Sequence, residues 1–134
     1  MTHDQVLAVL SALEHRCGIA INHDDWHSLR IPGGIAMERH SMSALSIAAA
    51  NYGDTKVTAY EMESINNEFD PVDVELSYEG MRQLRALMMS HFDLLLVPES
   101  KQWILLLSNE MEGIVFGPSK FVGELRRAVG SKDN

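Results

Sequence analysis

The sequence predicts an α+β fold, in which an antiparallel sheet is flanked by three helices within a single domain over residues 1–134. Three observations lead to this prediction. A length of 134 residues is close to the commonest size of one domain. Apolar residues recur at helical spacing in three segments that begin with capping residues. Between the last two of these segments, short apolar runs alternate with turn residues, as in a meander of antiparallel strands.

The first helix is expected from His3 to about Arg16. Thr2 and Gln5 have the spacing of a capping box, and apolar residues follow at helical intervals. The stretch 19–34 is expected to be irregular, because it holds an Asp-Asp pair, a proline and a Gly-Gly pair.

The region 41–64 can be interpreted in two ways. Residues 41–50 are rich in alanine and compatible with a helix, but Asn-Tyr-Gly-Asp at 51–54 is a turn signal and the residues beyond it favour a strand. We predict a β-hairpin over residues 44–64, with a helix as the alternative for 41–50. The segment 66–73 is polar and contains a proline, so a connecting loop is expected there.

The C-terminal half carries the clearest pattern. A second helix is expected from the Ser77 cap to His91, and a last helix between Ser119 and Gly130. The strands between these two helices have apolar residues at consecutive positions, which predicts that both faces of the sheet are covered. These strands are expected at residues 92–97, 102–107 and 113–116.

Charge and cysteine content exclude several classes of function. Eleven basic against nineteen acidic residues give a net charge of −8, which opposes direct binding to nucleic acid. The apolar runs at 94–98 and 103–107 are far shorter than the roughly 20 residues that span a bilayer, so we expect no membrane segment. Cys17 is the only cysteine, which excludes an internal disulfide and predicts a cytoplasmic protein.

Most of the acidity lies in one segment. Residues 38–80 contain nine acidic and two basic residues. Acids grouped in this way either form a solvated face or dock on a basic partner. As a docking surface, the segment 54–79 offers Glu61, Glu63, Glu68, Asp70, Asp73 and Glu75 as partner-binding residues, with Asp54 and Glu79 at its ends.

A short cluster near the N-terminus could bind a metal ion. If residues 23–27 were extended, His23, Asp25 and His27 would point to one side, as in a site of two histidines and one carboxylate. If they were helical, the two histidines would still meet, because they are four positions apart. The alternative is a solvated loop. No G-x-S-x-G, H-E-x-x-H, paired C-x-x-C or G-x-G-x-x-G motif is present. The absence of these motifs does not exclude an enzyme. Our expectation is nevertheless a protein without catalytic residues, metal or cofactor, with the metal site at His23, Asp25 and His27 as the alternative.

Four stretches near the C-terminus carry a resemblance to a known class of protein. They are Phe92–Pro98, Trp103–Leu107, Glu112-Gly113 and Phe116–Pro118. The part of the chain that contains them, residues 91–129, resembles small bacterial immunity proteins, which neutralise a cognate toxin. In such proteins, a hairpin with a tryptophan on its second strand leads to a glycine-containing strand and a terminal helix. The resemblance implies that the partner is a toxin.

The resemblance and the charge distribution favour the same hypothesis. A toxin that cleaves nucleic acid must be basic to hold its substrate, and an acidic protein can cover that surface. We expect a non-enzymatic cytoplasmic protein that neutralises a basic partner such as a nuclease toxin. Two alternatives are a small metal-dependent enzyme that uses His23, Asp25 and His27, and a small subunit of a larger assembly. The sequence leaves the oligomeric state open.

Overall fold

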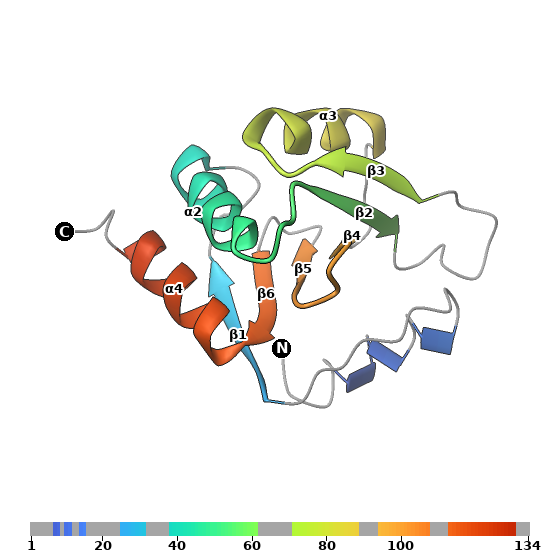
Figure 1. Ribbon diagram of the computed structural model, residues 1–134. Helices are drawn as coiled ribbons and strands as arrows, with labels where there is room; N and C mark the ends of the chain where they lie inside the picture. Colours follow the sequence, from blue (N-terminus) through green and yellow to red (C-terminus); the bar gives the residue numbers. More distant parts are fainter. Residues whose placement is uncertain are drawn as a thin grey trace.

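The computed structural model describes residues 7–8, 10–11, 14–15, 25–31, 38–61, 71–88, 94–107 and 113–130. It has the predicted α+β arrangement (Figure 1). The strands of its sheet are β1 (Trp26–Ile31), β2 (Lys56–Glu61), β3 (Val72–Glu75), β4 (Leu94–Pro98), β5 (Ile104–Leu107) and β6 (Gly113–Pro118). The helices are α2 (Arg39–Ala50), α3 (Tyr78–Met88) and α4 (Ser119–Gly130), and the described residues before position 16 are also helical.

The strands form one sheet in the order β1-β6-β5-β4-β2-β3, and every neighbouring pair is antiparallel. Helices α2, α3 and α4 cover one face, where Leu45, Leu84 and Phe121 pack against the strands. On the other face Leu10, from the N-terminal helical residues, packs with Leu95 and its neighbours. All side chains of β4 and β5 are buried, which confirms that both faces are covered in this region.

The predicted C-terminal pattern is confirmed. β4, β5 and β6 follow one another in the sheet as a meander. The N–H of Gly80 donates a hydrogen bond of 3.0 Å to Ser77 Oγ, so Ser77 caps α3 as expected. Phe121 anchors α4 by stacking on Trp103, with ring centroids 5.3 Å apart. Such a pair stabilises a core by about 1 kcal/mol beyond the area it buries.

The hairpin predicted over residues 44–64 is wrong in its first half. Residues 44–50 belong to α2, whose Met42, Leu45 and Ala49 side chains are buried against the sheet. The turn signal at 51–54 ends this helix instead of joining two strands. Gly53 has a φ of 78°, and the N–H of Asp54 donates to the carbonyl of Ala49. Beyond it the predicted strand is present as β2, which pairs with β3 and β4.

Two strands lie where the sequence predicted irregular structure. β1 falls within the stretch 19–34 and pairs with β6, with Leu29 opposite Val115. β3 begins at Val72, inside the expected loop 66–73, and pairs with β2. In both places, sheet partners distant in sequence outweigh the local turn-forming residues.

Among the described residues, no helix combines the length and the hydropathy that a membrane span requires.

Candidate functional site

The edge strand β3 carries the exposed acids of the predicted docking surface. Its four residues alternate between the two faces of the sheet. Val74 is buried on the face that the helices cover, whereas Asp73 and Glu75 are exposed on the opposite face. Side chains two positions apart on one strand are roughly 7 Å apart, so two carboxylates lie close together here.

The neighbouring strand β2 holds these acids in place. Asp73 lies opposite Thr58, and the Thr58 hydroxyl donates a hydrogen bond of 2.8 Å to Asp73 Oδ1. Glu75 lies opposite Lys56, whose positive charge offsets part of the repulsion between the two carboxylates. The hydrogen bond from Thr58 uses Oδ1 of Asp73, so Oδ2 is available as an acceptor for a basic group of a partner.

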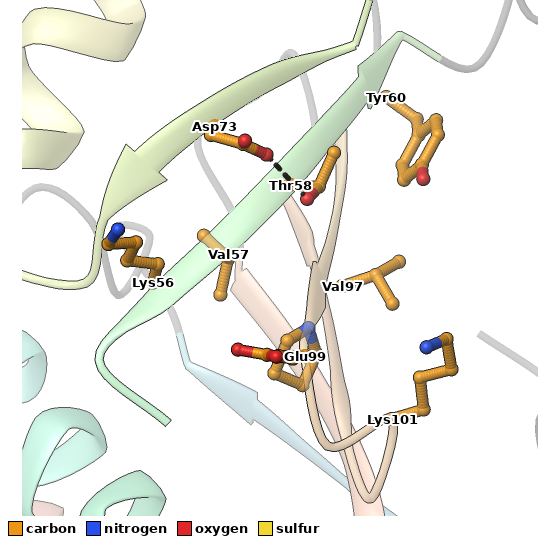
Figure 2. A pocket seen from close by; sticks show the side chains of 9 residues that line it. Lys56, Val57, Thr58, Tyr60, Asp73, Val97, Glu99 and Lys101 are labelled. Carbon is orange, nitrogen blue, oxygen red and sulfur yellow. Dashed lines mark hydrogen bonds between the residues drawn. The ribbon is translucent and has the colours of Figure 1, made fainter. Parts of the chain in front are cut away.

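Two concavities border this edge. One has a volume of about 440 Å³ and lies between β2, β3 and the β4–β5 turn; Figure 2 shows its lining side chains. The other, of about 560 Å³, lies between β3 and the C-terminal end of α2. Lys56 and Asp73 line both of them. The first is lined by Lys56, Val57, Thr58, Tyr60, Asp73, Val97, Pro98, Glu99 and Lys101, a charged rim around Val97 and Pro98.

Asp54 is not part of the surface, and its expected place in the docking segment is wrong. Only 5% of this residue is exposed. Its carboxylate accepts three hydrogen bonds, from Ser100 N at 3.1 Å, from Ser100 Oγ at 2.6 Å and from the indole Nε1 of Trp103 at 3.0 Å. These bonds tie the end of α2 to the β4–β5 turn, so the role of Asp54 is structural.

The other predicted acids are described only in part. Glu61 is the last residue of β2. Glu63, Glu68 and Asp70 lie outside the described residues. Glu79 is exposed in the first turn of α3 and forms an ion pair with Arg82, with 3.2 Å between Oε2 and Nη1. The structure therefore brings together Asp73 and Glu75 of the predicted set.

The structure describes two of the three predicted metal ligands, Asp25 and His27. Asp25 has a φ of 61°, a left-handed conformation that interrupts the alternation of side chains before β1 begins. His27 is exposed on β1, and His23 lies outside the described residues. Within the described ranges, no three His, Cys, Asp or Glu residues are grouped as metal ligands. Binding through His23 stays a prediction that metal analysis of the purified protein, with His23→Ala as the control, can test.

Sequence reasoning missed the partners of the exposed acids. The alternation Val-Asp-Val-Glu at 72–75 has the period of two that is typical of a half-buried strand, and it could have identified β3. Nothing in the local sequence indicates that Thr58 and Lys56 lie opposite its acids.

Comparison with known proteins identified no relative of this chain. No protein-family model matches this chain, and no curated protein or solved structure is significantly similar to it. Inference about function therefore depends on the chemistry of the β3 edge.

Proposed function

We propose that this protein is a non-enzymatic binding protein that neutralises a basic protein partner, such as a bacterial nuclease toxin, in the cytoplasm. The observation that carries the proposal is the pair of exposed carboxylates, Asp73 and Glu75, on one face of an edge strand. They belong to the segment 38–80, which contains nine acidic and two basic residues. The resemblance of residues 91–129 to immunity proteins supports the same class of function.

Electrostatic attraction gives this surface a defined role. A nuclease must present positive charge to hold a phosphate backbone. An acidic partner is steered to that charge, and such steering raises association rates by about 10- to 1000-fold. Salt weakens the attraction, because the screening length falls from about 10 Å at 0.1 M to about 3 Å at 1 M ionic strength.

Charge reversal tests the proposal. We expect Asp73→Lys and Glu75→Lys together to slow association with the product of the adjacent gene by on the order of tenfold at low salt. The effect should shrink at high salt. Association and dissociation rates can be measured with the partner immobilised on a surface.

A matched control separates local docking from net charge. Glu14→Lys changes the charge by the same amount as either single reversal, and Glu14 is an exposed residue of the N-terminal helical segment. We expect it to leave association nearly unchanged. If the adjacent gene product does not bind, or if Glu14→Lys slows association as much as Asp73→Lys, the proposed function is wrong.

A further inference from the structure

The backbone of β3 has hydrogen-bonding groups that point away from the sheet. The N–H of Leu76 donates to the carbonyl of Thr55, with 2.9 Å between N and O, so these two residues form a hydrogen-bonded pair. In an antiparallel ladder such pairs alternate with pairs that do not exchange hydrogen bonds. Val74 therefore bonds to β2, whereas the N–H and C=O groups of Asp73 and Glu75 face outward.

One of these outward groups, the carbonyl of Glu75, is hydrogen-bonded by the residue that precedes α3. The carbonyl of Glu75 accepts a hydrogen bond of 2.9 Å from the N–H of Ser77, and Gly80 packs directly against it. This leaves the N–H and C=O of Asp73 and the N–H of Glu75. Within the part of the chain that the structure describes, no hydrogen bond reaches these three groups.

The open backbone groups belong to the two residues with exposed carboxylates. A strand added to this edge would therefore meet both a ladder of backbone groups and two negative side chains. In an antiparallel hydrogen-bonded pair, side chains directly opposite each other lie on the same face. Residues of the added strand opposite Asp73 and Glu75 would thus place their side chains beside the two carboxylates.

We propose that β3 binds an extended basic segment of the protein partner as an additional antiparallel strand. Asp73 would exchange two backbone hydrogen bonds with one partner residue, and Glu75 would donate a third. Lysine or arginine at alternate positions of the segment would pair with the two carboxylates. The inference rests on the proposed function and specifies how the partner docks. The concavity beside Asp73 and Glu75, about 560 Å³, gives neighbouring partner side chains room.

A basic peptide tests this mode of binding on the unmodified protein. The probe is a seven-residue peptide in which lysine and threonine alternate, with both ends blocked. We expect the amide NMR signals of Asp73 and Glu75 to shift and their hydrogen exchange to slow when it binds. Methylation of the lysine backbone nitrogens blocks the edge that faces β3, whereas methylation of the threonine nitrogens leaves that edge free.

The two methylated peptides carry the same charge, so they separate strand addition from simple attraction. We expect methylation at lysine to weaken binding by up to about tenfold relative to methylation at threonine, because it removes the one hydrogen bond that the peptide donates to the Asp73 carbonyl. Equal affinity of the two peptides, or unmoved signals at Asp73 and Glu75, would overturn the inference.

A pair of variants repeats the test from the side of the protein. Asp73→Pro removes the outward N–H, a substitution that edge strands tolerate because no backbone hydrogen bond within the sheet is lost. It also removes the carboxylate that accepts the hydrogen bond from the Thr58 hydroxyl. Asp73→Asn removes the charge alone. We expect Asp73→Pro to bind the peptide several-fold more weakly than Asp73→Asn, and equal affinities would contradict strand addition. If the whole partner still binds with the expected salt dependence, only strand addition fails; if charge reversal leaves the partner unaffected, the proposed function fails too.

Discussion

The buried carboxylate of Asp54 gives the sharpest test of how the fold is held together. Asp54 accepts hydrogen bonds from the backbone N–H and the hydroxyl of Ser100 and from the indole N–H of Trp103. Trp103 is fully buried, and Asp54 is 5% exposed. Replacing Asp54 with alanine removes the acceptor from all three donors at once.

The cost follows from the donors that cannot reach water. A buried donor without a partner costs about 1–3 kcal/mol. The Trp103 indole N–H and the Ser100 backbone N–H are held by the surrounding structure, whereas the Ser100 hydroxyl can rotate toward another partner. We therefore expect Asp54→Ala to lower the free energy of unfolding by about 2–6 kcal/mol. That is a large part of the 5–15 kcal/mol that is typical of a domain.

Urea unfolding followed by tryptophan fluorescence measures this free energy. Asp73→Ala is the matched control, because it also removes a hydrogen-bonded carboxylate, but one whose donor, the Thr58 hydroxyl, can bond to water instead. It should change stability by no more than about 1 kcal/mol. Trp103→Phe removes one donor but keeps a ring against Phe121. In a double-mutant cycle, we expect it to couple to Asp54→Ala by about 1–3 kcal/mol. A loss below about 1 kcal/mol for Asp54→Ala would refute the assigned role.

Other predictions concern two glycines and a tyrosine. A methyl group on Gly80 would overlap the Glu75 carbonyl, so we expect Gly80→Ala to lower the melting temperature despite its higher helix propensity. For a methyl group on Gly123 the nearest atom among the described residues belongs to the flexible Arg127 side chain, so Gly123→Ala should raise stability by up to about 1 kcal/mol. Partial burial, and secondly the Glu124 carboxylate, raise the pKa of Tyr52 above 10.0. The contribution of protonated Tyr52 to the free energy of unfolding is complete below about pH 10 and is lost as the pH rises through the pKa of the folded state. In urea unfolding, Tyr52→Phe should therefore lose less stability between neutral and alkaline pH than the unmodified protein does.

The elements that the sequence predicted well are those whose local pattern agrees with their environment. β4 and β5 are continuous apolar runs because both faces of the sheet are covered there. Ser77 caps α3 through a contact within four residues of sequence. In each of these places the signal and the structure that it produces lie in the same few residues.

The elements that were missed depend on distant partners. β1 is a strand because β6 lies beside it, and the turn-forming residues around it gave no sign of that. Residues 44–50 were ambiguous because alanine fits a helix while the turn at 51–54 fits a hairpin equally well. The buried position of Asp54 follows from Ser100 and Trp103, which lie 46 and 49 residues away. A count of acidic residues along the chain cannot distinguish the buried Asp54 from the exposed Asp73.

The difference between the buried Asp54 and the exposed acids of β3 matters for the proposed function. The three hydrogen bonds of Asp54 lie inside the protein, so its substitution should lower the stability of the fold. Asp73 and Glu75 are exposed, and their outward N–H groups bond to nothing in the described part of the chain. Substitutions at the β3 edge should therefore leave the core intact and report on docking alone. The same independence would let the edge vary in sequence to match a partner while the helices and the meander stay unchanged.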